Sequence, residues 1–387
     1  SINVESGETL TISNGNTVGS ICSKGDLTVT NLIMDKNSSS ASVISMDGGN
    51  LIINGGNIFG KITTEENDSA SVTISGNNFY GDVDLRVNST INGGSFNQYL
   101  YLSASSFTIN DITLKDFSTV SDYSLIINVD ADVKIVDGTF DSGVKVNDGS
   151  LTIDGGTFNK QLTVENNSDA TVKINNGEFN DIVHLSGTGT VNNGTFNNTL
   201  SLREGNFIIN NGTVNGTTAG ALNLLMANVE IKGGTFNSEV SCGLSSDRVA
   251  PAVDTIKISG GVFTGSSGGL CIAGEDKLTL SGGTFKYTGD DDLGAIVVTT
   301  INDVDTSVFN SFLESSYVYS DTINPVKDDT REYVYISNKE ISVVETETSN
   351  NNSNPKTGDS ILAFFGMFGL SIISLIVLFF KKKIYNN

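Results

Sequence analysis

Apolar residues recur along this chain in one fixed register. An apolar–polar–apolar triplet is followed by a Gly/Asn turn and then by an aromatic residue, as in residues 151–158 (LTIDGGTF) and 172–179 (VKINNGEF). An apolar residue at every second position predicts a β-strand with one buried face. We call the residue that ends each unit the landmark. The landmarks are Phe79, Phe96, Phe140, Phe158, Phe179, Phe196, Phe236, Phe263 and Phe285, with Ile58, Phe117 and Val214 in degenerate copies.

The residues around each landmark complete the repeat. Gly stands two positions before nearly every landmark, and because Gly tolerates positive φ, we expect a sharp bend there. A second apolar pair follows four and six positions after the landmark, for example Val83 with Leu85 and Leu162 with Val164. This pair predicts a second strand, whose residues three, five and seven positions after the landmark face outward.

A single unit of roughly 20 residues cannot bury its apolar face alone, whereas stacked units bury it continuously. The repeat therefore predicts an all-β fold, a parallel β-helix (β-solenoid) of about thirteen rungs over residues 1–300, right-handed as such crossovers usually are. At about 4.8 Å a rung, it would be about 60 Å long. We expect stacked Phe rings in its core and Asn ladders at its turns. A β-sandwich fits less well, because sandwich strands do not repeat one motif in one register.

The repeat stops after Thr300. Tyr, Val and Ile alternate with polar residues in the following segment, which predicts a small β-rich unit over residues 301–344. Such a unit would cover the last rung, because an open rung end would template aggregation. A separate binding module is the alternative.

The C-terminal tail has four parts in order. A polar spacer (345–353) precedes Asn354-Pro355-Lys356-Thr357-Gly358, then an uncharged apolar stretch (361–380) and a basic tail (381–387). Twenty apolar residues as a helix are long enough to span a bilayer, and the Lys cluster indicates the cytoplasmic side. An ordinary single-pass membrane anchor is one interpretation.

This tail also resembles the sorting signal of Gram-positive sortase substrates, whose pattern is Leu-Pro-x-Thr-Gly, an apolar span and a basic tail. The resemblance implies cleavage between Thr357 and Gly358 and transfer of the threonyl carbonyl to an amine of the peptidoglycan precursor. Asn354 departs from the usual Leu, which leaves the sortase class open. The partners implied are a sortase, peptidoglycan, and the membrane before sorting.

The repeats themselves resemble those of β-helical Gram-positive surface proteins with Ser/Asn-Gly-Gly-Thr-Phe units, over about Leu51 to Thr300. Both resemblances imply an adhesin-like protein on the extracellular face of the cell wall. A surface protein needs an export signal, and none precedes Ser1, so we expect a processed or truncated N-terminus.

Charge and composition exclude some classes. The net charge is -22 and the chain has only 22 Lys and Arg, so a nucleic-acid binder is excluded because it needs a basic patch. Three Cys make no disulfide framework, and one His gives no Cys/His zinc site. Cys271 is expected to face outward.

Five outward residues form the candidate ligand face: Asp82, Asp84, Arg86, Tyr99 and Tyr101. Exposed tyrosines stack on sugar rings, while carboxylates and Arg bind hydroxyl groups, so the set predicts a carbohydrate groove. The alternative is a solvated strand face with ion pairs between rungs.

The acidic residues allow two further kinds of chemistry. The Asp82/Asp84 pair is typical of acid–base catalysis, which would make the chain a wall-bound polysaccharide lyase or hydrolase, although basic residues are scarce. Asp290, Asp291 and Asp292 form an acidic loop that is a weak calcium candidate, because it lacks the spacing of a defined calcium loop. No other cofactor is expected.

Three functions therefore stay open: an adhesin that binds host or bacterial glycans or glycoproteins, a polysaccharide-degrading enzyme, and a passive structural stalk. Of these, the adhesin is favoured: an enzyme is not expected, and no residue is predicted to be catalytic.

Overall fold

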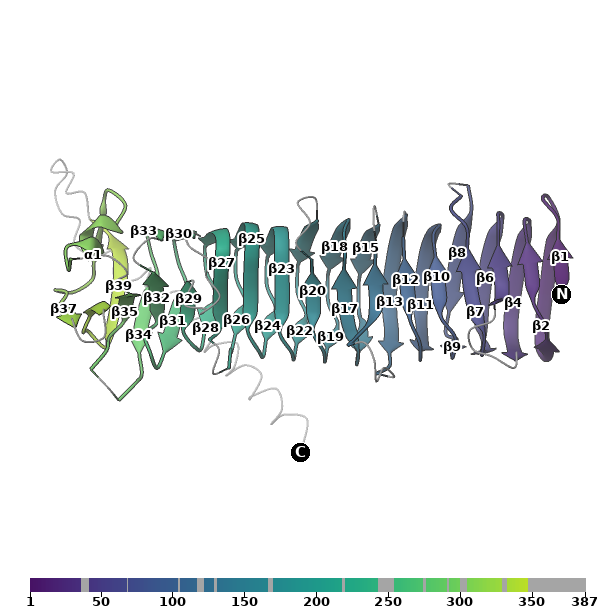
Figure 1. The fold of residues 1–387 in the computed structure, drawn as a ribbon, viewed down its shortest axis with the longest axis horizontal. Coiled ribbons are helices and arrows are strands. Elements are labelled where there is room, and N and C mark those ends of the chain that lie inside the picture. Colours follow the sequence, from purple (N-terminus) through teal and green to yellow (C-terminus); the bar gives the residue numbers. More distant parts are fainter. Residues whose placement is uncertain are drawn as a thin grey trace, which may run out of the picture. The chain divides into compact units, whose positions relative to one another are not determined.

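The computed structural model describes residues 1–346, apart from 36–41, 68, 104, 117–121, 129–130, 166–169, 218–219, 243–253, 274–275, 291, 300–304 and 329–332. These residues form an all-β parallel solenoid (Figure 1). The fold class predicted from the repeat is confirmed. The predicted sorting motif, span and basic tail lie outside the described residues.

Each rung contributes a strand to three parallel stacks, which we call A, B and C. Stack A holds the strands before the bend: β2 (Thr9–Val18), β4 (Asp26–Asp35), β6 (Asn50–Ile58), β8 (Ser71–Ser75), β11 (Asn88–Phe96), β13 (Ser106–Leu114), β15 (Asp132–Ile135), β18 (Ser150–Ile153), β21 (Thr171–Ile174), β30 (Thr255–Ile258) and β33 (Lys277–Leu280). β2, β4, β6, β11 and β13 continue round the bend into stack B.

Stack B carries the landmarks on its remaining strands: β9 (Asn78–Phe79), β16 (Gly138–Phe140), β19 (Thr157–Phe158), β22 (Glu178–Phe179), β24 (Thr195–Phe196), β26 (Thr213–Val214), β28 (Thr235–Phe236), β31 (Val262–Gly265) and β34 (Thr284–Tyr287).

Stack C holds the strands after the landmark: β1 (Ile2–Val4), β3 (Ile21–Ser23), β5 (Ser42–Met46), β7 (Lys61–Thr64), β10 (Val83–Leu85), β12 (Leu100–Leu102), β14 (Tyr123–Ile127), β17 (Gly143–Val146), β20 (Leu162–Val164), β29 (Val240–Cys242), β32 (Leu270–Ala273) and β35 (Ile296–Thr299). Three long strands run from stack C into stack A of the next rung: β23 (Val183–Val191), β25 (Leu200–Ile209) and β27 (Leu222–Ile231).

The core follows from the register. Leu151 pairs with Val172 and Ile153 with Ile174, so equivalent apolar residues lie above one another in successive rungs. These side chains are at most 4% exposed, and the polar residues between them face outward. The period-two pattern in the sequence therefore gives one continuous core running through the solenoid.

The landmark rings stack along the core, as the sequence predicts. Phe140, Phe158, Phe179 and Phe196 form one run with centroids 4.5, 4.8 and 4.7 Å apart. Phe236, Phe263 and Phe285 form a second run, which Val214 separates from the first. A buried Phe that loses its ring typically costs about 3–5 kcal/mol, so these runs are major contributors to stability.

Glycine makes the bend between stacks A and B. Gly56 has φ +108°, and a Cβ there would collide with the Leu32 carbonyl oxygen of the preceding rung. Any larger residue would be strained both in its backbone and against its neighbour. This close approach explains why Gly recurs two positions before the landmark.

Asparagine ladders run along two edges of the solenoid, which confirms another expectation. In one ladder each Asn Nδ2 donates to the side-chain oxygen one rung earlier, from Asn237 back to Asp141, over 2.7–2.8 Å. A second ladder runs from Asn210 back to Asp154. Both ladders end on a carboxylate, which only accepts hydrogen bonds.

One landmark was placed wrongly. Leu114, not Phe117, pairs with Phe96 and with Phe140. Phe117 itself lies outside the described residues. The position requires an apolar side chain that points inward, and Leu114, which is fully buried, meets this requirement.

The C-terminal segment covers the last rung, as predicted. β38 (Tyr333–Ile336) pairs antiparallel with β35, and β39 (Glu340–Glu345) pairs antiparallel with β34. β36 (Tyr317–Tyr319) pairs antiparallel with β39, and β37 (Pro325–Asp328) pairs antiparallel with β38. The short helix α1 (Val308–Ser311) buries Phe309. Because these strands are integral to the solenoid's end, the segment is a cap rather than a separate module.

Cys271 points away from the solenoid core, as the sequence predicts, but it is only 3% exposed. It packs with Val297 and Tyr335 on a sheet that β38 extends. Burial raises the pKa of its thiol far above the ordinary range. Cys22, by contrast, is exposed.

Candidate functional site

The five predicted ligand residues lie together on the outward side of stack C. β10 pairs in parallel with β7 and β12, which aligns Asp84 with Thr63 on one side and with Tyr101 on the other. Asp82 and Tyr99 stand just before their strands, so the same register makes them neighbours. The apolar residues between them, such as Val83, are buried, which turns all five candidates outward.

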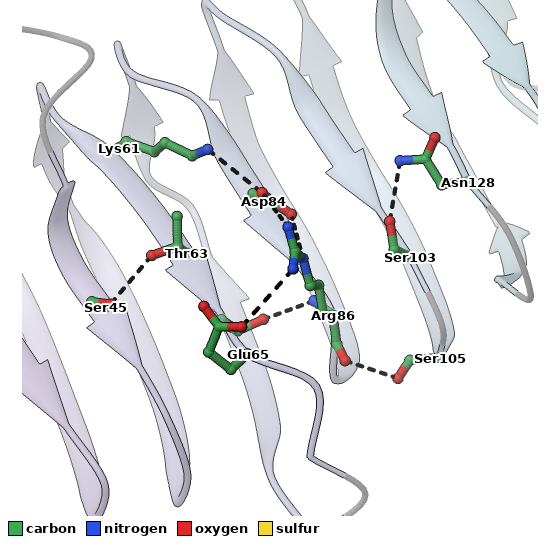
Figure 2. Close-up of polar contacts among 10 residues, drawn as sticks. Ser45, Lys61, Thr63, Glu65, Asp84, Arg86, Ser103, Ser105 and Asn128 are labelled. Carbon is green, nitrogen blue, oxygen red and sulfur yellow. Dashed lines mark hydrogen bonds and ion pairs between the residues drawn. The ribbon is translucent and has the colours of Figure 1, made fainter.

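Asp84 is the centre of an ion-pair network, drawn in Figure 2. Its carboxylate lies 3.5 Å from Lys61 Nζ and 3.4 Å from Arg86 Nε. Arg86 Nη1 also lies 3.9 Å from Glu65 Oε2. The Asp84 side chain is 14% exposed, so its charge is held between two cations in a partly desolvated place.

Sequence reasoning missed Glu65, although a signal for it exists. Glu65 and Arg86 both stand seven positions after their landmarks, Ile58 and Phe79. The same repeat position on neighbouring rungs places two side chains next to each other, and these two carry opposite charges. Applying the register to charged residues would have found this pair.

Tyr99 and Tyr101 form the aromatic part of the face. Their ring centroids are 5.4 Å apart and their planes are tilted by 30°. The pKa of Tyr101 is raised, mainly by partial burial and then by the negative charge of Asp82, with smaller effects from Tyr99 and Asp84. The charges of Asp82 and Asp84 both disfavour ionisation of the Tyr101 hydroxyl.

Asp82 differs from Asp84 in its surroundings. Its side chain is partly exposed and makes no hydrogen bond or ion pair with any residue that the structure describes. The two carboxylates that the sequence treats as a pair are thus unequal: Asp84 is neutralised by neighbours, and Asp82 is available.

The outward side of stack C continues beyond the tyrosines with a second set of paired groups. Lys145 Nζ lies 2.7 Å from Glu165 Oε1 and 5.9 Å from the centre of the Tyr123 ring. The hydroxyls of Tyr123 and Thr163 lie 2.9 Å apart. In this set, as in the network around Asp84, each positive charge is paired with a carboxylate of the protein.

His184 lies further along the same face. It is half-buried, and its Nδ1 has no hydrogen-bond partner among the described residues. Burial and the charge of Arg203 lower its pKa, so the ring is neutral at pH 7. A neutral, partly covered imidazole adds no positive charge to the face.

The other predicted sites gain no support here. Asp290 and Asp292 are exposed, and Asp291 lies outside the described residues. Within the described part of the chain, no group of three or more His, Cys, Asp or Glu side chains could hold a metal ion. The same residues include no helix long and apolar enough to cross a membrane. Asn354 to Gly358 and the predicted span 361–380 fall beyond them.

Comparisons of the chain with family models, with curated proteins and with solved structures found no match.

Proposed function

We propose that this protein is a sortase-anchored surface protein whose solenoid binds glycans outside the cell. Two parts of the chain support the proposal separately. The tail has the order of a sorting signal, with Pro355, Thr357 and Gly358 ahead of an apolar stretch and a Lys cluster. The solenoid is an extended scaffold that carries a polar and aromatic face on stack C.

The observation that carries the binding function is the Tyr99/Tyr101 pair beside Asp82. Two partly exposed rings offer flat apolar area to the face of a pyranose, and an available carboxylate accepts hydrogen bonds from sugar hydroxyls. Aromatic area with a few placed polar groups is the usual composition of a ligand site.

The same geometry favours binding over catalysis. A carboxylate pair in a glycosidase needs one member as acid and the other as base or nucleophile. The Asp84 carboxylate is already bound by Lys61 and Arg86, so it would have to give up these contacts to donate a proton to a substrate. A polysaccharide-degrading enzyme stays the alternative, and a passive stalk is the third function that the test below distinguishes.

The binding test uses the full 387-residue chain, produced in a host without sortase and kept in detergent. Binding to host glycoproteins and bacterial polysaccharides is measured together with the release of new chain ends. We expect saturable binding without cleavage, which Tyr99→Ala and Tyr101→Ala each weaken roughly tenfold or more, while Thr152→Ala on stack A leaves it unchanged. Cleavage would make the protein an enzyme, and no binding at all would favour a stalk.

The anchoring test uses the chain behind an export signal in a Gram-positive host. Wild type and Thr348→Ala are expected in the cell-wall fraction, released by muramidase with peptidoglycan fragments attached. Thr357→Ala is expected to stay with the membrane, because the acyl group that is transferred belongs to Thr357. Equal wall attachment of Thr357→Ala and wild type would refute the proposed cleavage site.

A further inference from the structure

We infer that the glycan bound at the Tyr99/Tyr101 face carries a positively charged amine, so that its ligand class is amino sugars with a free ammonium group. The inference rests on the proposed glycan binding and names the ligand of that same site. Three features of the face support it: its cations are already paired, one of its carboxylates is available, and its two tyrosine rings attract cations.

The cations near the tyrosines are engaged by the protein itself. Lys61 and Arg86 both pair with Asp84, and Arg86 also lies beside Glu65. On the next part of the face Lys145 pairs with Glu165 at 2.7 Å. A uronic acid or a sulfated sugar would have to break one of these pairs to find a partner.

The remaining charge is negative. Lys61 and Arg86 are outnumbered by Asp82, Asp84 and Glu65, and Asp82 is the member without an ion pair among the described residues. Partial burial is the main cause of the raised Tyr101 pKa, and the charges of Asp82 and Asp84 add to it. The whole chain, at a net charge of -22, also attracts cations and repels polyanions.

The aromatic pair suits the same ligand. Ring faces carry negative charge density, so a cation within about 6 Å of a Tyr centroid is attracted, and the attraction grows as water is excluded. The register places Asp82 beside Tyr99 and Asp84 beside Tyr101. A pyranose on the rings therefore brings an attached ammonium group within reach of the Asp82 carboxylate.

The test compares two hexasaccharides that differ only in acetylation: chitosan hexamer, whose amines are free, and chitin hexamer, whose amines are acetylated and neutral. Binding to the full chain in detergent is measured by calorimetry at a mildly acidic pH, at low and at high salt. We expect the chitosan hexamer to bind roughly tenfold more tightly than the chitin hexamer. Asp82→Asn should abolish this difference in affinity.

Asp321→Asn is the matched control, because it deletes one exposed acidic charge in the cap, far along the sequence from this face. If the preference for the free amine survives in Asp82→Asn as it does in Asp321→Asn, it reflects the overall charge of the chain, and the inference is wrong. Equal affinity of wild type for both hexamers would also overturn it, while leaving glycan binding intact. If neither hexamer binds but another glycan of the wider panel does, the amine inference alone fails.

Discussion

Phe140 and Phe158 lie ring over ring in the core, with centroids 4.5 Å apart and planes only 3° from parallel. The parallel pairing of β16 with β19 sets this arrangement, because it repeats every inward side chain one rung further along. Phe158 in turn stacks on Phe179 at 4.8 Å, so it has an aromatic neighbour on both sides.

Phe158→Ala should therefore lower the free energy of unfolding by about 3–5 kcal/mol, since it removes a buried ring and leaves a cavity between two others. Phe158→Leu, which keeps most of the volume, should cost less, about 1–2 kcal/mol. Urea titration of the full chain measures both. Lys160→Ala, an exposed neighbour in sequence, is the control and should change stability by less than about 0.5 kcal/mol. Equal effects of Ala and Leu at position 158 would contradict the stacking account.

The repeat made most of the fold predictable from sequence. Leu151 and Ile153, with their equivalents, alternate strictly, and a strict period-two pattern repeated at a near-constant interval leaves few folds besides a solenoid. The landmark predicted at Phe117 was wrong because the inward position does not require an aromatic residue. It accepts any apolar side chain, and Leu114 occupies it.

The site was predictable in position but not in chemistry. Alternation alone turns Asp82, Asp84 and Tyr101 to one side, because the apolar residues between them must face the core. It does not show which cation each carboxylate meets, since Lys61 reaches Asp84 from the previous rung through a long, flexible side chain. The burial of Cys271 was missed for a different reason: it depends on β38, which is distant in sequence and pairs antiparallel.

Asp154 predicts a pH dependence of stability. Lys134 Nζ lies 2.8 Å from its carboxylate and Asn175 Nδ2 donates to it, and these contacts hold the pKa of Asp154 below its ordinary value in the folded state. A carboxylate with a lowered folded-state pKa contributes stability above its unfolded pKa and loses it as pH falls through the folded value.

Asp154→Asn should consequently be less stable than wild type at neutral pH, by no more than about 1 kcal/mol because the pair is solvent-exposed. The difference should disappear at acidic pH, below the lowered pKa, where wild type has lost the charge as well. Urea titrations at a series of pH values measure this convergence. Lys134→Met should show the same convergence, since it removes the other partner; a difference that stays constant with pH would rule out the ion pair as its source.

The cap predicts unequal reactivity of two cysteines. Cys22 is exposed, whereas Cys271 is buried with Val297 and Tyr335, and burial disfavours the thiolate that reacts. A maleimide added to the native chain should label Cys22 quickly and Cys271 only after unfolding, as read by peptide mapping. Tyr335→Ala should expose Cys271 while leaving Cys22 unchanged. Rapid labelling of Cys271 in wild type would show that β38 does not cover this part of stack C.

Asp84 predicts a change of specificity, because its carboxylate offsets the positive charges of Lys61 and Arg86. Asp84→Asn leaves Lys61 and Arg86 without their shared carboxylate, and Arg86 keeps only the longer 3.9 Å contact with Glu65. Lys61 and Arg86, on the two rungs before the tyrosines, should then attract anions. The variant should therefore bind oligogalacturonate several-fold more tightly than wild type, with an affinity that falls as salt rises. Asp141→Asn, on the Asn-ladder edge, removes the same charge elsewhere and should give no such gain. A gain of equal size in both variants would trace the effect to net charge, whereas a gain confined to Asp84→Asn would establish that this carboxylate keeps anionic glycans away from the tyrosine pair.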